Sequence, residues 1–350
     1  MPQHFWFGFA RKMANNSNNN SIIQAPFLRL LSAASADNDC NNSILGVHGF
    51  VEYMPGDTNL IISVPHGGDM RPPFMDDRTK SKFITLATLN GEEICKPVSD
   101  EESVIDEDDD TNDKISTVAD IFTKEIAQTL VSEFEVLTSR KPHLILANIH
   151  RSKVDPNRPI ENAALGNKLA EAVYKDYHKF IVEAKTRVEG PGLLIDLHGQ
   201  NHHQNSIEIG YLYTKTMLNQ GNYSSLAAGP SVRALLARHQ LTPASLLLGD
   251  RSLGAMFEAA GYRACPSPRQ PCPGRDRYYK GGYITQTHGS SASAGQQQPG
   301  HNQNIDAIQL ELPAEVRHGG GPECREQFAR SCARVLVKFM ETYYSPEDTL

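Results

Sequence analysis

The sequence predicts an α/β fold, a three-layer sandwich with a mixed, largely parallel central sheet. Short apolar runs typical of buried strands alternate along the chain with longer segments whose apolar residues recur at helical spacing. Such an alternation builds a sheet with helices on both of its faces. One apolar run, 192–197, ends directly before His198, and another, 59–64, ends two residues before His66. A glycine follows each of these histidines. The carboxyl ends of strands are where open α/β sheets bind their ligands.

Six apolar runs are predicted to form the strands. The run 59–64 is almost continuously apolar, which is typical of a strand buried on both faces. The run 206–213 alternates apolar and other residues, as a half-exposed strand does. The predicted strands are 45–53, 59–64, 143–149, 192–197, 206–213 and 307–312.

Five segments carry apolar residues at the spacing of one helical face. The first of these segments has Ser116 or Thr117 as its predicted N-cap, and Asp120 suits its first turn. The predicted helices are 116–134, 162–183, 231–239, 252–260 and 323–343.

A single catalytic domain over about 45–345 is the simplest organisation, because the sequence shows neither a repeat nor a natural internal linker. We interpret residues 1–44 as a disordered leader. A mitochondrial targeting segment is the alternative, since the first 36 residues contain Lys and Arg but no acid. The acidic run 100–113 is interpreted as a solvated insertion. The Gly-, Pro-, Ser- and Gln-rich tract 261–300 is better suited to active-site loops than to a core.

The formal net charge of −7 at pH 7 argues against a protein that holds nucleic acid electrostatically. No apolar run approaches the roughly 20 residues that span a bilayer. The six cysteines do not form the close pairs of a structural zinc site, and reduced thiols are preferred over a disulfide between Cys265 and Cys272. We therefore expect a cytoplasmic protein with a small-molecule partner and no nucleic-acid or membrane partner. A mitochondrial or secreted location and the oligomeric state stay open.

His66, Asp69 and His198 are the predicted metal ligands. His66 closely follows the apolar run 59–64, Asp69 lies three residues later, and His198 follows the run 192–197. Two imidazoles and one carboxylate make a three-ligand set suited to catalytic zinc, which keeps a fourth position for water. Asp196 and His198 lie on one face of a strand, so Asp196 is a candidate to orient the imidazole. The alternatives are structural histidines and a loop-capping Asp196.

The segment 151–159 is a candidate anion clamp. It contains Arg151, Asp155, Asn157 and Arg158. Guanidinium groups bind carboxylates in a bidentate manner, an amide beside them completes a clamp, and Asp155 can hold an arginine in place. The alternative is a surface turn with weak salt bridges.

Glu311 is a charged residue within the apolar run 307–312. A carboxylate there is costly unless it is paired or used, and next to an activated water it can act as a general base. The alternative is that strand alternation points Glu311 to solvent. His288, before a glycine in the loop that leads to Glu311, is a further candidate for the pocket.

These residues, in order and type, resemble the zinc carboxypeptidase and aspartoacylase superfamily. That superfamily has a His-x-x-Glu pair, an Asn-Arg pair, a later His and a Glu near the end of its domain. The motifs Pro-His-Gly-Gly at 65–68, Asp-Leu-His-Gly at 196–199 and Ile-Gln-Leu-Glu at 308–311 look like the N-formylglutamate amidohydrolase family. The resemblance covers about residues 45–340, and it implies a zinc-carboxypeptidase-like fold.

The resemblance implies a role for each matching residue. His66, Asp69 and His198 become the ligands of one Zn²⁺ per chain, and Glu311 becomes the general base. Arg151 becomes the group that holds the oxyanion, and Asn157 and Arg158 become the clamp for the substrate carboxylate. Asp69 stands where the carboxypeptidases have Glu, and the shorter side chain demands a closer backbone approach, which Gly67 and Gly68 can permit.

The activity implied by the resemblance is zinc-dependent hydrolysis of the amide of an N-acylated acidic amino acid, most simply N-formyl-L-glutamate. One alternative keeps the site and changes the substrate to a peptide C-terminus or a γ-glutamyl chain, as in a metallocarboxypeptidase or a γ-glutamyl hydrolase. The other alternative is a metal-binding protein without turnover.

Overall fold

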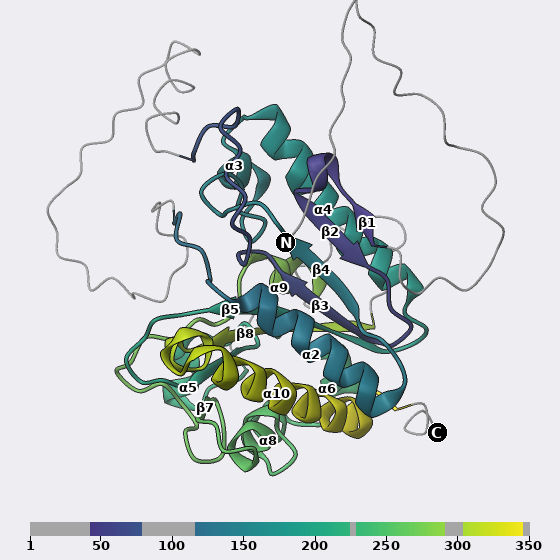
Figure 1. The fold of residues 1–350 in the computed structure, drawn as a ribbon. Helices are drawn as coiled ribbons and strands as arrows, with labels where there is room; N and C mark the ends of the chain where they lie inside the picture. The colour runs from purple at the N-terminus through teal and green to yellow at the C-terminus, as the bar shows by residue number, and fades with distance from the viewer. Residues whose placement is uncertain (1–42, 79–115, 225–228, 291–303, 346–350) are drawn as a thin grey trace, which may run out of the picture. The chain divides into compact units, whose positions relative to one another are not determined.

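One mixed sheet of eight strands forms the centre of the protein (Figure 1). This computed structural model describes residues 43–78, 116–224, 229–290 and 304–345, which belong to a compact unit of residues 40–350. The predicted leader up to residue 42, the acidic run 100–113 and residues 291–303 lie outside the described residues. The strands are β1 (Ile44–Leu45), β2 (Val51–Met54), β3 (Leu60–Val64), β4 (His143–Ala147), β5 (Gly192–Gly199), β6 (Ile207–Gly210), β7 (Ala264–Cys265) and β8 (Ile305–Leu312).

The strand order is β1-β2-β4-β3-β5-β8-β6-β7. The four central strands β4, β3, β5 and β8 are parallel to their neighbours within this group. β2 and β6 run antiparallel at either side of the group. The mixed α/β sheet predicted from the sequence is therefore present. The parallel strands end at one edge, which brings together the residues that follow β3, β5 and β8.

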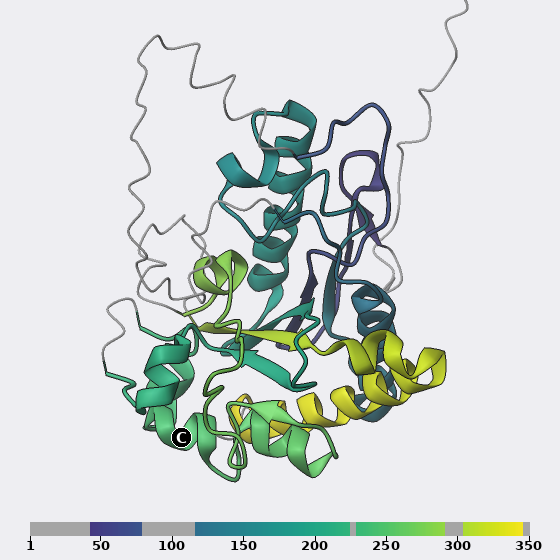
Figure 2. The same cartoon turned by 90° about the vertical axis from the view of Figure 1, so that its left-hand side faces the viewer.

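The helices occupy both faces of the sheet. Longer helices are α2 (Thr123–Thr138), α4 (Lys168–Arg187) and α10 (Gly321–Tyr343). Shorter ones are α3 (Ile160–Ala164), α5 (Lys215–Gln220), α6 (Arg233–Arg238), α7 (Pro243–Leu248), α8 (Leu253–Ala259) and α9 (Tyr283–His288), with one-turn elements η1 (Val47–Gly49) and η3 (Glu315–Gly319). Figures 1 and 2 show α4 on one side of the sheet and α2, α8 and α10 on the other.

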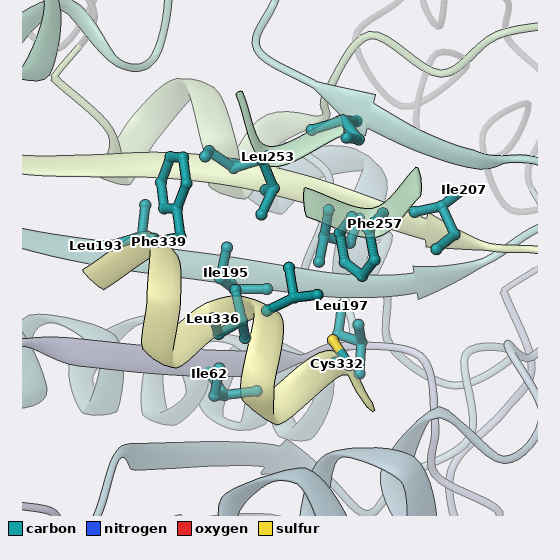
Figure 3. Packing of buried hydrophobic residues seen from close by; sticks show 14 of the residues in the cluster. Ile62, Leu193, Ile195, Leu197, Ile207, Leu253, Phe257, Cys332, Leu336 and Phe339 are labelled. Carbon is teal, nitrogen blue, oxygen red and sulfur yellow. The ribbon is translucent and has the colours of Figure 1, made fainter. Parts of the chain in front are cut away.

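Two hydrophobic clusters follow from the alternation of side chains along the strands. Leu193, Ile195 and Leu197 of β5 pack with α2, α8 and α10 (Figure 3). Leu194, which points the other way, packs with α4. β3, β5 and β8 are buried along both faces except for the last residue of β5, which explains why apolar residues predominate in their sequences.

The α4 face of the sheet carries a row of polar side chains. Ser63, Asp196, His198, Gln309 and Glu311 alternate with the residues that pack under α2 and α10, so all five project to the opposite face. Each of them is buried. Buried polar groups on adjacent strands need partners, and their partners form the site described below.

Several predicted boundaries were wrong because residues with positive φ interrupt the chain. The predicted strand 45–53 is divided into β1 and β2 by a turn with His48 at φ 53°. The predicted helix 162–183 is divided into α3 and α4 at Leu165, which has φ 48°. α2 begins at Thr123 and not at 116, because Phe122 has φ 69°. Neither Ser116 nor Thr117 caps that helix.

Other differences come from short elements. β6 was predicted to be half exposed but is fully buried between β8 and β7. α5 and α7 were not predicted, and the tract 261–300 contains β7 and α9. Among the described residues, no helix combines the length and the apolar character that crossing a membrane requires.

Leu336 tests the packing of α10 on the sheet. Its side chain is fully buried beside Ile195 and Leu197 (Figure 3). We expect Leu336→Ala to lower the free energy of unfolding by about 2–5 kcal/mol, because the cavity left behind adds to the lost burial. Denaturant unfolding measures this change. Lys338→Ala, at an exposed position of the same helix, should change it by less than about 0.5 kcal/mol, and an equal loss in both variants would contradict the packing.

Candidate metal centre

Three neighbouring strands deliver polar side chains to one edge of the sheet. His66 follows β3 by two residues, and His198 and Glu311 lie near the ends of β5 and β8. His198 and Glu311 are directly opposite each other in the parallel register of β5 and β8. His66, His198 and Glu311 are all buried. The two imidazoles lie together, with 4.8 Å between the ring centroids of His66 and His198.

His66, His198 and Asp120 form a group that can hold a metal ion, with one ligand atom from each within 4.8 Å of the others. Oδ2 of Asp120 lies 3.3 Å from Nδ1 of His66 and 3.1 Å from Nδ1 of His198. With bonds of about 2.0–2.1 Å in tetrahedral geometry, neighbouring zinc ligands lie about 3.3 Å apart. The two nitrogen-to-oxygen distances are close to this value.

A buried carboxylate holds the second nitrogen of each imidazole. Nε2 of His66 lies 2.7 Å from Oδ1 of Asp155, and Nε2 of His198 lies 2.9 Å from Oδ2 of Asp196. A neutral imidazole that donates its Nε2–H to a carboxylate presents the lone pair of Nδ1, which is the arrangement that metal-binding histidines adopt. Asp196 thus makes the contact that its place in the sequence suggested.

Asp196 is itself fixed from the α4 face. Its Oδ1 accepts a hydrogen bond of 2.9 Å from Ser63 Oγ, which also lies 2.8 Å from the hydroxyl of Tyr177 in α4. A side chain of α4 is therefore connected through Ser63 and Asp196 to the imidazole of His198. This chain of contacts explains why a serine interrupts the apolar strand β3.

Buried carboxylates and imidazoles set the pKa values of the group. Burial acts to raise the pKa of Asp120, but the charges and hydrogen bonds of His66 and His198 outweigh it and keep that pKa well below its usual value. Burial acts to lower the pKa of His198, but Asp196 and Asp120 raise it well above its usual value. Asp120, Asp155 and Asp196 thus surround the two imidazoles, and Arg151 and Arg78 pair with Asp155.

Asp69 does not belong to this group. It is exposed, whereas Asp120 is buried. After Gly68 the chain pairs with the segment that follows β4, through a backbone hydrogen bond of 3.0 Å from Met70 to Asn148. A Cβ at Gly68 would lie 2.4 Å from the backbone of Asn148, so this glycine permits contact with a neighbouring segment and not with a metal. The carboxylate that the structure brings to the imidazoles is therefore Asp120.

Gly67 helps to place Asp120. A Cβ at Gly67 would lie 2.7 Å from Thr123 Oγ1 and 2.9 Å from the amide of Lys124, at the start of α2. The lack of a side chain lets this start approach β3, and the amide of Asp120 donates a hydrogen bond of 3.0 Å to the carbonyl of His66. Asp120 was predicted only as a residue of the first helical turn. The left-handed Phe122 that excludes it from α2 leaves no clear signal in the sequence.

Arg151 lies beside Asp120. Its Nε donates to Oδ2 of Asp155 at 3.0 Å, and its Nη1 lies 3.9 Å from Oδ1 of Asp120. Asp155 therefore contacts Arg151 and His66 together, and Arg78 approaches the same carboxylate at 3.5 Å. Burial acts to lower the pKa of Arg151, but the charges of Asp155 and Asp120 raise it. The guanidinium is thus held in its charged form next to Asp120.

Asn157 and Arg158 lie next to this group, but Asn157 is already engaged. Its Nδ2 lies 3.3 Å from Nε2 of His198, and its Oδ1 accepts a hydrogen bond of 2.8 Å from the amide of Ile284 in α9. Arg158 is partly exposed, and its Nη1 donates to the carbonyl of Asn157 at 3.1 Å. Of the two predicted clamp residues, Arg158 has the more accessible side chain.

His288 is buried at the end of α9, where it contacts His178. Its Nε2 lies 2.8 Å from Nδ1 of His178, whose Nε2 lies 3.0 Å from the carbonyl of Pro156. His288 therefore supports the segment that carries Asn157 and Arg158. It is not a member of the metal group.

Glu311 is buried beside His198 and has one oxygen without a hydrogen-bond partner among the described residues. Its Oε1 accepts a bond of 2.9 Å from Gln309, whereas Oε2 has no partner. Burial raises the pKa of Glu311 to about 8, with Asp120 and Glu208 adding to the rise and His198 and Arg151 opposing it. At neutral pH a carboxyl group with this pKa is mostly protonated, and it would accept a proton from a water only where a cation in the metal group lowered that pKa.

Comparisons with known proteins give little further information. No protein-family model and no curated protein matches the chain. One solved structure with a likeness is a succinylglutamate desuccinylase from Chromobacterium violaceum, which is 12% identical in sequence. The match covers 85% of this chain and 72% of that chain at a TM-score of 0.33. A structural similarity this weak assigns neither a fold family nor an activity to this chain.

Asp120→Asn and Asp69→Asn together test which carboxylate belongs to the metal group. We expect Asp120→Asn to weaken zinc binding by more than the roughly 10–100-fold that loss of an outer partner costs, because a charged ligand is removed. Asp69→Asn should leave the affinity unchanged, because Asp69 is exposed and separate. Competition with a chelating dye measures both values, and the reverse pattern would show that Asp69 is the ligand.

Proposed function

We propose that this chain is a zinc-dependent amidohydrolase that cleaves the amide of an N-acylated acidic amino acid, with N-formyl-L-glutamate as the first substrate to test. One observation carries the proposal: two buried imidazoles present Nδ1 to a buried carboxylate, and Asp155 and Asp196 hold their other nitrogens. We take residues 45–345 as the catalytic domain and its fold as a three-layer sandwich of the zinc-carboxypeptidase type.

The proposed metal ligands are His66, Asp120 and His198. Zinc in such a site supplies a Lewis acid for the carbonyl and lowers the pKa of a water to near 7. The three side chains differ from the set predicted from the sequence only in the carboxylate. The geometry of their ligand atoms supports one metal ion per chain.

Glu311 is the proposed general base. Its free Oε2 and its position opposite His198 support this role, because a base must lie within hydrogen-bond reach of the attacking water. Glu311 would take the proton of that water and then give it to the leaving amine. Amide hydrolysis needs both transfers, since an amine leaves readily only after it is protonated.

Arg151 is the proposed group that stabilises the negative charge on the carbonyl oxygen. The salt bridge to Asp155 fixes the guanidinium before substrate binds, so it would not have to reorganise during the reaction. Because Arg151 lies beside Asp120, its positive charge is next to the proposed metal ligands.

Arg158 is the proposed partner of the carboxylate of the amino acid, with Asn157 beside it. Its partial exposure supports this role, since a guanidinium in contact with solvent can exchange water for a substrate. Asn157, bonded to Ile284, would orient the clamp more than it binds substrate. His288 would support the clamp indirectly, because it contacts His178, which contacts the carbonyl of Pro156.

Glu311→Gln tests this assignment. We expect about one zinc per chain in both wild type and variant, and a fall in kcat of about 10²–10⁴-fold in the variant, because only the proton acceptor is removed. Metal analysis and hydrolysis of N-formyl-L-glutamate on the same preparations measure the two quantities.

Two results would contradict the assignment. Full activity in Glu311→Gln would exclude Glu311 as the base. Wild-type protein that retains zinc but hydrolyses neither N-formyl-L-glutamate nor other N-acylated acidic amino acids would exclude the proposed reaction, and blocked dipeptides or γ-glutamyl chains would then be the substrates to test.

A further inference from the structure

Arg317 is a buried arginine that the proposed chemistry does not use. It lies in η3, a turn of π-helix directly after β8, and its residue is 2% exposed. Single turns of π-helix are frequent at functional sites. Placing a guanidinium in the interior is costly unless its donors are satisfied, so the partners of Arg317 indicate what it does.

The guanidinium bonds to three segments that each carry a residue of the site. Nη1 donates to the carbonyl of Ile121 at 3.1 Å, Nη2 to that of Gln200 at 2.8 Å, and Nε to that of Leu312 at 3.0 Å. Nη2 also donates to Oδ1 of Asn201 at 2.8 Å.

The positions of these acceptors relate Arg317 to the proposed ligands and base. Ile121 directly follows Asp120, and Leu312 directly follows Glu311. Gln200 lies two residues after His198. One side chain therefore connects the segments of two proposed ligands and of the proposed base, although these segments are far apart in the sequence.

Gly199 leaves the space that this guanidinium needs. A Cβ at position 199 would lie 2.4 Å from Nε of Arg317 and 2.6 Å from its Cζ. The glycine after His198 thus has a physical reason separate from metal or substrate. Lysine could not replace the arginine, because it offers a point charge without the planar fork of donors.

We propose that Arg317 is a positioning residue of the metal centre, which sets the spacing of Asp120, His198 and Glu311 by hydrogen-bonding the carbonyls of Ile121, Gln200 and Leu312. The catalytic part of this inference rests on the proposed function, whereas the part on metal affinity and local order does not. Arg317 itself contacts neither the ligand atoms nor the carboxylate of Glu311 in this role.

Arg317→Lys tests the inference, because it keeps the positive charge and removes the planar set of guanidinium N–H donors. We expect zinc affinity to fall by about 10–100-fold, the range for loss of groups that orient ligands. We expect kcat for N-formyl-L-glutamate to fall while KM changes little, since the acceptors of Arg317 lie in other segments than the clamp of Arg158. Chelator competition and steady-state kinetics on the full chain measure these values.

Arg238→Lys is the matched control. Arg238 is also largely buried, and it bonds to the carbonyl of Tyr343 and lies over the ring of Tyr344, away from the metal group. The Arg238→Lys variant should have a lower free energy of unfolding and an unchanged zinc affinity. Wild-type zinc affinity in Arg317→Lys, or an equal loss in Arg238→Lys, would overturn the inference.

Hydrogen exchange of the metal-free full chain gives a readout that needs neither zinc nor substrate. We expect Arg317→Lys to speed exchange in three separate segments, around residues 118–124, 198–202 and 310–314. Faster exchange confined to 310–320 would overturn the inference, because Arg317 would then stabilise only its own turn. If wild-type protein hydrolysed no acylated amino acid, the proposed function would fail while zinc affinity and exchange would still decide the role of Arg317.

Gly199→Ala keeps the arginine and displaces it, so it tests the inference if Arg317→Lys does not fold. Gly199→Ala should reduce zinc affinity by about 10–100-fold, as Arg317→Lys does. In the double variant the two effects should be less than additive, because both act through one guanidinium. Full additivity would contradict the shared cause.

Discussion

The hydrogen bonds from Asp155 and Asp196 to the two imidazoles are the interactions on which the rest of the site depends. Each carboxylate is fully buried and lies within 2.9 Å of an Nε2. Together they turn both Nδ1 atoms toward Asp120. Burying three carboxylates around two imidazoles is costly, and a protein keeps such an arrangement only where the charges are paired or used. Arg151 and Arg78 pair with Asp155, and a bound divalent cation would add a further positive charge beside Asp120.

The two faces of the sheet differ in composition. The face under α2 and α10 is apolar, whereas the opposite face packs apolar residues against α4 and also carries Ser63, Asp196, His198, Gln309 and Glu311 in one row. Because β3, β5 and β8 are parallel and adjacent, a residue near the end of one strand meets a residue near the end of the next. The buried Arg317 then connects the loops that continue beyond these ends.

The parts of the site that strands carry could be predicted from the sequence. His66, His198, Asp196 and Glu311 stand at the ends of apolar runs, and the periodicity of a strand fixes the face on which each one lies. Arg151 could be placed near them only through the resemblance of the segment 151–159 to a family pattern, with Asp155 as a residue that can hold an arginine. The strands themselves were located within a few residues wherever the chain had no residue with positive φ.

Asp120 could not be predicted as a site residue, because its position depends on contacts between distant segments. The left-handed Phe122, the absence of a side chain at Gly67 and the backbone bond to His66 together bring it to the imidazoles. Asp69, three residues after His66, matched a sequence pattern, but the chain there pairs with Asn148 and points the side chain to solvent. The role of Arg317 depends in the same way on three segments that only the fold brings together.

The most direct test of the central claim is the position of a zinc ion in a crystal of the full chain, located by anomalous diffraction at the zinc edge. The account predicts one strong peak per chain, bonded to Nδ1 of His66, Nδ1 of His198 and the carboxylate of Asp120, with both Nε2 atoms still held by Asp155 and Asp196. A peak bonded to Asp69, or no peak at these imidazoles in zinc-saturated crystals, would contradict it.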